Sequence, residues 1–293
     1  MSNKTSEKKS SPAEKNKGVR ITIKNTSEGS VKERPRIHTL DELRGFAVFC
    51  MIFFHAFYTI GFVFGQKWGV TLVDFFYPAE PYFAGLFIII SGIASNLSHS
   101  NLERGVKLAL ISLAVSIVSL IVLGQKGMIQ FGILHFLSAA MIFYGLTNKY
   151  LRLIPSVLGI ILNILLFILT YNITSHTIGL PYLFSFTLPD SLYSTEYLFM
   201  LGFPNSKFYS SDYFPIIPWL FLFIAGAFLG MILVKRKFPK FMFKKRIPPL
   251  AFLGRHSLLV YLAHQPVIFA LCYAVQGVVF AWNTLIGFCG AVF

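Results

Sequence analysis

The chain has 293 residues, of which 55% are hydrophobic and only 13% are charged. A soluble domain carries about 25% charged residues, so this chain has too few charged groups to cover the surface of a soluble protein. Its apolar runs are continuous and do not alternate with polar residues, which argues against a β-barrel. The composition therefore predicts an all-α fold, a polytopic bundle of transmembrane helices in a lipid bilayer.

The N-terminal segment differs from the rest of the chain. Residues 1–38 contain ten Lys/Arg, many Ser, Glu and Asn, and almost no large apolar side chains. Such a segment cannot form a hydrophobic core, and it lacks the apolar stretch and cleavage site of a signal peptide. We therefore expect a disordered basic cytoplasmic tail over 1–38 and a transmembrane domain over 39–293.

Apolar runs of about 20 residues predict the membrane-spanning helices. Seven such runs follow in chain order: 40–62, 82–98, 107–124, 129–147, 153–171, 216–234 and 256–278. Residues 279–293 are also apolar, so a break near Gly277 or Asn283 would add a short eighth helix. We expect seven to eight spans.

The positive charges indicate the orientation of these helices. With the N-terminus inside, 23 of the 26 Lys/Arg fall in inner segments or at inner helix ends, and Lys67, Lys126 and Lys207 remain outside. Cytoplasmic loops of membrane proteins carry such an excess of positive charge, so we expect a cytoplasmic N-terminus. The net charge of +14 then reflects topology and does not indicate a nucleic-acid partner.

Two loops and the cysteines allow further predictions. The inner loop 235–246 mixes cations with aromatic residues, which suits a lipid-headgroup anchor or an electropositive mouth for a phosphate-bearing ligand. The outer stretch 172–215 is rich in Tyr, Phe, Ser and Pro, which suits a sugar-binding loop or an interfacial helix. The cysteines, Cys50, Cys272 and Cys289, lie in apolar segments without metal-ligand spacing, so we expect no metal.

Titratable residues inside a membrane are costly and mark candidate functional sites. In the first helix, Arg44 and His55 are eleven residues apart, which places them on one helix face with a rise of about 16 Å between them. Asp41 is spaced to pair with Arg44. Three more such residues fall in or beside later helices: His135, Asp212 and His264. A bundle lined in this way can enclose a water-filled passage across the membrane.

Five ordered motifs carry a family resemblance. They are Leu40-Asp41-x-Leu43-Arg44-Gly45 with His55, then Ser91-Gly92 with Asn101-x-x-Arg104-Gly105-x-Lys107, then Phe131-Gly132-Ile133-Leu134-His135-Phe136, then Ser211-Asp212-Tyr213-Phe214-Pro215 with Pro218-Trp219, and finally Leu253-Gly254-Arg255-His256-Ser257 with Tyr261, His264, Gln265 and Pro266. In these motifs the sequence resembles the catalytic-domain family of heparan-α-glucosaminide N-acetyltransferase, and specifically its short bacterial members. The spacing of the first motif is also similar to that of the acyltransferase type three group of membrane enzymes.

The resemblance implies a membrane acyltransferase. In such enzymes an acyl group, typically acetyl, passes from cytosolic acyl-CoA to a sugar amine or hydroxyl on the extracytoplasmic side. The implied donor substrate is acetyl-CoA, the implied acceptor is a glycan or amino sugar, and the implied location is a bacterial plasma membrane, with assembly into a homo-oligomer left open. The animal enzyme has its catalytic histidine after the first helix, where residues 64–69 of this chain contain none. The catalytic role is therefore transferred to His55.

Acyl transfer needs a base that removes a proton from the acceptor. A histidine in apolar surroundings is expected to be neutral and able to accept that proton, so we expect His55 to be the general base, or else a transient acyl carrier, with His135 or Asp212 orienting it. The expected acyl-CoA-binding set is Arg44, Arg104, Lys107, Arg255, His256 and His264, in which the cations at the inner face would bind the phosphates. A small-solute or proton-coupled transporter and a non-catalytic membrane partner are the alternative functions.

Overall fold

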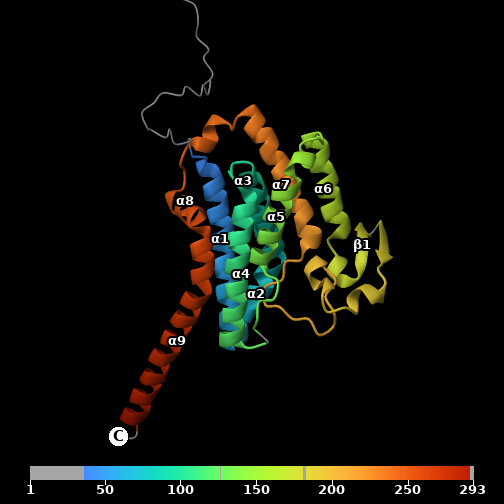
Figure 1. The fold of residues 1–293 in the computed structure, drawn as a ribbon. Helices are drawn as coiled ribbons and strands as arrows, with labels where there is room; N and C mark the ends of the chain where they lie inside the picture. Colours follow the sequence, from blue (N-terminus) through green and yellow to red (C-terminus); the bar gives the residue numbers. More distant parts are fainter. Residues whose placement is uncertain (1–35, 126, 181–182, 291–293) are drawn as a thin grey trace, which may run out of the picture. The chain divides into compact units, whose positions relative to one another are not determined.

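The structure is a computed structural model that describes residues 36–125, 127–180 and 183–290. The tail expected over 1–38 lies almost entirely outside the described residues. From Arg36 onward the chain is one compact unit, in which long helices run side by side (Figure 1). The predicted all-α transmembrane bundle is therefore confirmed in its fold class.

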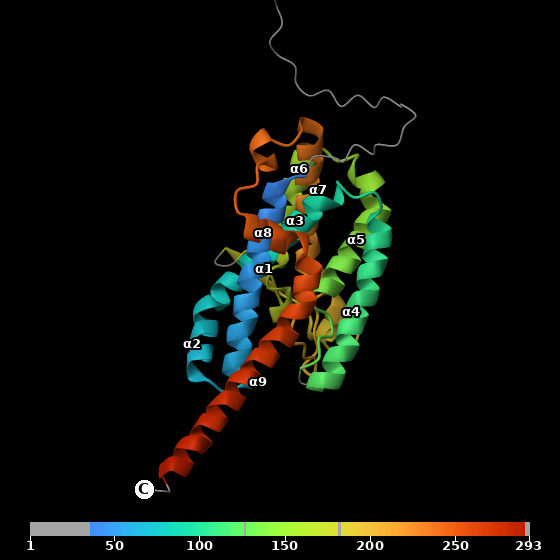
Figure 2. The same ribbon diagram turned by 90° about the vertical axis from the view of Figure 1, so that its left-hand side faces the viewer.

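Most of the helices follow one another with short connections. The helices of the described residues are α1 His38–Tyr58, α2 Lys67–Phe76, α3 Glu80–Ser95, α4 Asn101–Leu123, α5 Ile133–Leu151, α6 Ser156–Thr170, α7 Ile216–Arg236, α8 Pro248–Arg255 and α9 Ser257–Gly290. A long stretch separates α6 from α7. In this part of the chain, 6 helical stretches are long and apolar enough to cross a membrane. The further long helix α5 runs beside α4 (Figure 2), so the number of spans agrees roughly with the prediction.

Two stretches differ from the predicted pattern. The segment between the first two predicted spans contains α2, which continues through a short turn, η2 (Tyr77–Ala79), directly into α3. At the other end of the chain, α9 is a single helix, so the break expected near Gly277 or Asn283 is absent from its described backbone. A glycine inside a helix is only about 1 kcal/mol less favourable than an alanine. Gly277 therefore does not interrupt α9.

Glycines bring α1 and α8 into backbone contact. A Cβ added at Gly45 of α1 would collide with the backbone of Leu250 in α8, and one added at Gly254 of α8 would collide with the backbone of Asp41. Small residues allow this kind of approach between helices in a membrane. The first and last of the five sequence motifs are therefore the two sides of one helix–helix contact.

The side chain of Glu42 in α1 also stabilises the contact between α1 and α8. Its side chain is buried, and Oε1 accepts hydrogen bonds from the backbone N–H groups of Arg246 (2.6 Å) and Ile247 (2.9 Å), immediately before α8 begins. A carboxylate is favourable at a helix N-terminus because it satisfies free N–H groups and faces the positive end of the helix dipole. Sequence reasoning assigned no role to Glu42, although it lies inside the first motif.

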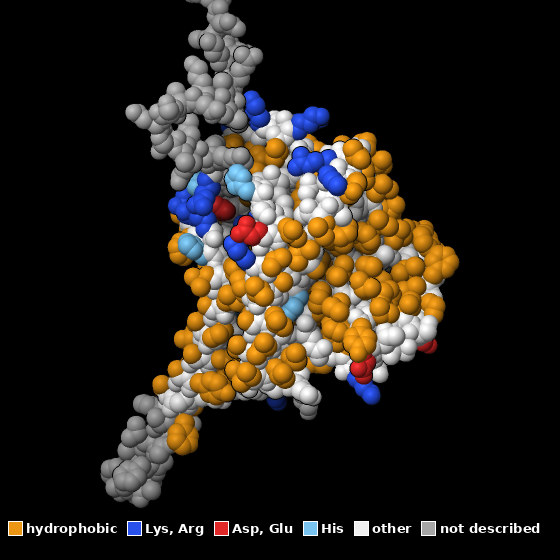
Figure 3. Space-filling model, viewed as in Figure 1, with side chains coloured by type: hydrophobic (Ala, Val, Ile, Leu, Met, Phe, Trp, Pro, Cys, Tyr) orange, Lys and Arg blue, Asp and Glu red, His pale blue; other side chains and the backbone are white. Residues whose placement is uncertain are grey.

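The hydrophobic core lies between α3, α5 and α7. Ile88, Phe136, Phe223 and Phe228 belong to it and are at most 1% exposed. Outside this core, α4, α6 and α9 carry many exposed apolar side chains, as expected for surfaces that face lipid. Figure 3 shows hydrophobic side chains over most of one face, with Lys and Arg gathered at the end where α1 begins and α7 ends.

The outer stretch 172–215 contains no long helix among its described residues. It holds an antiparallel hairpin of β1 (Thr177–Leu180) and β2 (Phe184–Thr187), in which Thr177 lies opposite Thr187. The remaining elements are the short turns η3 Ile173–Ser175, η4 Asp190–Tyr193 and η5 Leu198–Leu201. The predicted alternative of an interfacial helix is thus not found here.

The end of this stretch runs beside the residues that precede α5. Phe131 and Tyr213 form a parallel bridge, and the N–H of Phe214 donates to the carbonyl of Phe131 at 3.0 Å. Because residues 128–131 are extended in this pairing, α5 begins at Ile133 and not at the predicted residue 129. His135 therefore lies in the first turn of α5, nearer to the helix end than the sequence predicts.

We predict that Gly45→Leu destabilises the protein, because its side chain fits only if α8 moves away from α1. Overpacking of this kind costs about 1–3 kcal/mol, so the melting temperature in detergent should fall. The control is Gly277→Leu in α9, where an added Cβ would meet no atom within 4 Å. Equal melting temperatures for the two variants would contradict the proposed packing.

Candidate active site

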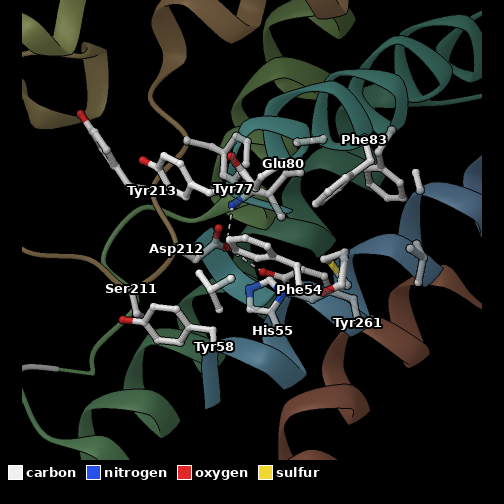
Figure 4. Close-up of a pocket in the computed structure, with 18 of the residues that line it drawn as sticks. Phe54, His55, Tyr58, Tyr77, Glu80, Phe83, Ser211, Asp212, Tyr213 and Tyr261 are labelled. Atoms are coloured by element: carbon white, nitrogen blue, oxygen red, sulfur yellow. Dashed lines mark hydrogen bonds between the residues drawn. The ribbon is translucent and has the colours of Figure 1, made fainter. Parts of the chain in front are cut away.

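A cavity of about 500 Å³ lies between α1, α2, α3, the residues before α7, and α9. One part of its wall is apolar and comes from α1 and α3: Ala47, Val48, Met51, Ala84 and Phe87. The other part is polar: Tyr58, Asp74, Tyr77, Glu80, Ser211, Asp212 and Tyr261. Asp74 and Ser211 are exposed, so the polar part reaches the surface. His55 lies between the two parts along α1, close to Asp212 and Tyr261 (Figure 4).

The hydrogen bond of His55 defines its tautomer. Nδ1 lies 2.9 Å from the carbonyl oxygen of Met51, one turn earlier in α1. A carbonyl oxygen can only accept, so Nδ1 carries the proton and donates it. The lone pair of the neutral ring is then on Nε2, which has no hydrogen-bond partner among the described residues. His55 is thus arranged to accept a proton from a molecule in the cavity.

Asp212 joins three segments at the polar part of the cavity. Its Oδ2 accepts hydrogen bonds from the backbone N–H of Ile133 at 3.1 Å and from the hydroxyl of Tyr261 at 2.8 Å. A side chain at Gly132 would collide with this carboxylate, so the glycine of the third motif is required by the close approach. Oδ1 makes no hydrogen bond to a described residue and is left for the cavity that Asp212 lines.

His135 does not line this cavity. Its Nδ1 accepts a hydrogen bond from the backbone N–H of Gly132 (3.3 Å), and its Nε2 donates to Ser116 Oγ on α4 (3.1 Å). The ring is therefore a cap of α5, and both nitrogens are used. Because α5 begins at Ile133, His135 lies in the first turn of this helix. Its ring caps the helix and does not reach the cavity that His55 lines.

His264 lies against His55. The two ring centroids are 5.1 Å apart, and the rings meet edge to face. His264 is 8% exposed, and its Nδ1 is 2.5 Å from the carbonyl oxygen of Tyr261 on the same helix. The sequence prediction assigned His264 to acyl-CoA binding, whereas the structure places it beside His55.

At the N-terminal end of α1, the predicted ion pair between Asp41 and Arg44 is not among the ion pairs of the described residues. Arg36, in the chain that leads into α1, approaches Asp41 instead, with Nε 3.9 Å from Oδ2. Arg44 is partly buried and has no hydrogen bond or ion pair to a described residue. The charge of Asp41 acts on it without a direct contact, and so, more weakly, does the charge of Arg104 at the start of α4. Arg44 therefore lies within electrostatic reach of a second cation and has no directly bonded acid among the described residues.

Unpartnered polar atoms lie near the starts of α1 and α4, the helices that carry these arginines. Of the five buried side-chain atoms without a hydrogen-bond partner among the described residues, four are found there: His38 Nδ1, Thr39 Oγ1, Asp41 Oδ2 and Asn101 Oδ1. Buried polar groups normally have partners, so this end of the bundle has the donors and acceptors of a site for a polar ligand. The unpaired arginines favour an anionic one.

The other predicted inner-face residues are exposed. Lys107 pairs with Glu103, one turn away on α4, with 2.5 Å between Nζ and Oε1. Arg255 follows the Gly254 contact at the end of α8, and the His256 ring lies 4.6 Å from that of Phe252. Arg104 is exposed as well, like Lys107, Arg255 and His256, but its charge acts on the partly buried Arg44. No group of three or more His, Cys, Asp or Glu within the described ranges could hold a metal ion.

Sequence reasoning gave no role to three residues of the cavity: Asp74, Glu80 and Tyr261, of which only Tyr261 was named in a motif. The first two lie in α2 and at the start of α3, which the hydropathy pattern assigned to the outer loop, so their approach to His55 was not visible. Tyr261 precedes His264 by one helical turn. That spacing could have placed it on the same face of α9.

One of three comparisons with known proteins found a match. Residues 36–266 match the family model described as heparan-alpha-glucosaminide N-acetyltransferase, catalytic. Comparisons with curated proteins and with solved structures found no match. The family match covers most of the chain and includes all five motifs and the whole cavity. The chain therefore belongs to the heparan-α-glucosaminide N-acetyltransferase catalytic-domain family.

Proposed function

We propose that the protein transfers an acetyl group from cytosolic acetyl-CoA to the amine of a sugar on the extracytoplasmic side of the membrane. The observation that carries this proposal is the position of His55. It lies in a cavity that is apolar on one side of it and acidic on the other. The family to which the chain belongs supplies the reaction type.

His55 acts as the general base in this proposal. Its Nδ1–H is held by Met51, so the lone pair on Nε2 accepts a proton from the acceptor nitrogen as that nitrogen attacks the thioester carbon. The C–S bond then breaks, and the CoA thiolate leaves with the electron pair and takes up a proton. General bases contribute a factor of about 10²–10⁴ to such rates.

The polar part of the cavity suits an amino sugar. Asp74, Glu80 and Asp212 line it, and such a set of acidic side chains favours a cationic ammonium over a neutral hydroxyl group. The free Oδ1 of Asp212 is available to accept a hydrogen bond from that ammonium. Tyr58 and Tyr77 provide aromatic surface against which a sugar ring can pack.

The inner end of α1 suits the nucleotide part of acetyl-CoA. Arg44 and Arg104 would hold its phosphates, and the unpartnered polar atoms near the starts of α1 and α4 would bind its other polar groups. The rise from Arg44 to His55 is about 16 Å. The pantetheine arm would cross that distance along the apolar face of α1 formed by Ala47, Val48 and Met51.

The distribution of charge supports the proposed orientation. Described Lys and Arg side chains gather at the end formed by the start of α1, the end of α7 and the turn η6 (Lys240–Phe243). That end is cytoplasmic by the excess of positive charge that cytoplasmic loops carry. The acidic part of the cavity then opens to the extracytoplasmic side.

A transporter is the second candidate function, because polar groups occur at several depths of the bundle. A transport path needs polar groups or water through its whole length. The inner part of this cavity is lined by alanine, valine, methionine and phenylalanine side chains, which favours passage of an acyl chain over passage of a hydrated solute. The enzyme is therefore the better supported function.

We predict that His55→Ala abolishes acetyl transfer in proteoliposomes that hold acetyl-CoA and glucosamine. The rate should fall by a factor of about 10²–10⁴, because the base is lost. The control is His99→Ala, which removes an exposed histidine between α3 and α4. Undiminished transfer by His55→Ala would remove this residue from the mechanism.

Acetyl-CoA should raise the melting temperature of the purified protein, because it binds the folded state. At 100 times its Kd the stabilisation is about 2.7 kcal/mol. We predict that Arg104→Gln weakens this shift, whereas Lys149→Gln, at the inner end of α5, leaves it unchanged. A transporter for another solute would show no shift with acetyl-CoA in any of the three proteins.

The orientation can be tested with single cysteines in a variant that lacks the three native ones. We predict that Lys207→Cys reacts with a membrane-impermeant maleimide on intact cells. Lys245→Cys, in the loop between α7 and α8, should react only after the cells are opened. The reverse pattern would show that the acidic part of the cavity faces the cytosol.

A further inference from the structure

His264 carries a buried lone pair to which the proposed reaction has so far assigned no role. Its Nδ1 faces the carbonyl oxygen of Tyr261 at 2.5 Å, so Nδ1 carries the proton of the neutral ring. Nε2 is then an acceptor, and it is buried without a hydrogen-bond partner among the described residues. A buried acceptor without a partner is costly, and its neighbours indicate what it serves.

The neighbour of this lone pair is the proposed base. The His55 and His264 ring centroids are 5.1 Å apart with an angle of 67° between the ring planes. Both rings hold their Nδ1 proton on a carbonyl of their own helix, so both have a lone pair on Nε2. Two lone pairs cannot form a hydrogen bond with each other. Once His55 is protonated, however, its Nε2–H can be donated to His264, directly or through one water molecule.

The described titratable groups around His264 are few. His55 faces it from α1, and Tyr261 lies next to it on α9. Tyr261 in turn donates its hydroxyl proton to Asp212. Next to His264 along α9, Gln265 accepts a hydrogen bond from the Thr59 hydroxyl, which does not titrate. A proton that leaves His55 toward α9 therefore meets His264 first.

The stoichiometry of the reaction releases two protons from the acceptor nitrogen. An acceptor bound as an ammonium loses two protons for each amide that forms. The first must leave before the nitrogen has a lone pair with which to attack the thioester carbon. The second leaves as the C–N bond forms, and it ends on the sulfur of CoA when the C–S bond breaks. A single imidazole holds only one of them at a time.

We infer that His264 is a positioning residue that takes the first proton from His55 and so returns His55 to its basic form before the C–N bond is made. The first proton goes from the ammonium to His55 Nε2 and on to the buried Nε2 of His264, and it returns through His55 to water in the cavity when the products leave. The second goes from the attacking nitrogen to His55 and then to the CoA thiolate. The inference rests on the proposed function.

The test compares two acceptors with wild type and His264→Gln, in which the amide side chain is polar but cannot carry the proton. Glucosamine is used below its own pKa, where it is an ammonium, and methoxyamine is neutral at the same pH. We expect His264→Gln to lower kcat for glucosamine by a factor on the order of 10², with little change in KM. With methoxyamine, which loses only one proton, kcat should stay near the wild-type value.

The other outcomes separate this inference from the proposed function. An equal loss of kcat with both amines would show that His264 is only structural, and no loss with either would show that it is not used. If wild type acetylates neither amine, the proposed function fails and the inference fails with it. If His55→Ala loses both activities while His264→Gln loses neither, only the inference fails. His99→Gln, an exposed histidine, is the control for the substitution itself.

A second measurement remains informative if glutamine disturbs the packing. In His264→Gly the missing ring leaves a space that small molecules can enter. Imidazole should restore transfer to glucosamine, whereas pyrazole, which has the same shape but is a far weaker base, should not. Equal rescue by both compounds would show that the ring only fills space and would overturn the inference.

Discussion

The Asp212 carboxylate is the interaction on which the candidate site depends. Its Oδ2 receives one hydrogen bond from the first turn of α5, at Ile133, and one from the Tyr261 hydroxyl on α9. Asp212 itself lies on the extended segment that leads into α7. One oxygen atom thus holds three distant parts of the chain together. Because both bonds use Oδ2, the other oxygen keeps its capacity to bind a substrate.

A second constraint acts at the opposite end of the bundle. The glycine contact between α1 and α8 and the Glu42 cap fix the position of α1. Helix α1 carries both Arg44 and His55, so fixing it also fixes the distance between the proposed phosphate site and the proposed base. An α-helix rises about 1.5 Å per residue, so the sequence spacing of two residues determines their separation along the helix axis. This is a physical reason for two anchors, one beside each end of the reaction path.

The sequence predicts the helices well because hydropathy alone marks long apolar runs. The face of α1 that lines the cavity was also predictable. The 3.6-residue period places Ala47, Met51, His55 and Tyr58 on one face of the helix, and all four line the cavity. Contacts between distant segments were not predictable in this way. The predicted ion pair between Asp41 and Arg44 was wrong. The cation nearest to the Asp41 carboxylate is Arg36, which precedes the helix.

The role predicted for His135 illustrates the same limit. Periodicity places a histidine on a helix, but it does not show where that helix begins. The start of α5 depends on the pairing of residues 128–131 with residues 211–214, which are far away in the sequence. Once the helix begins at Ile133, the ring of His135 becomes its cap. Glu42 and Tyr261 were overlooked for a related reason, because their partners come from other helices.

The central claim is that the acetyl group reaches His55 from the cytoplasmic end along α1. A structure of the protein with a non-hydrolysable acetyl-CoA analogue tests this most directly. The account predicts phosphates at Arg44 and Arg104 and the acyl carbonyl in the cavity, with its carbon about 3–3.5 Å from where an acceptor nitrogen bonded to His55 would lie. An acyl group found outside the cavity, for example in the groove between Phe64 and Cys272, would contradict it.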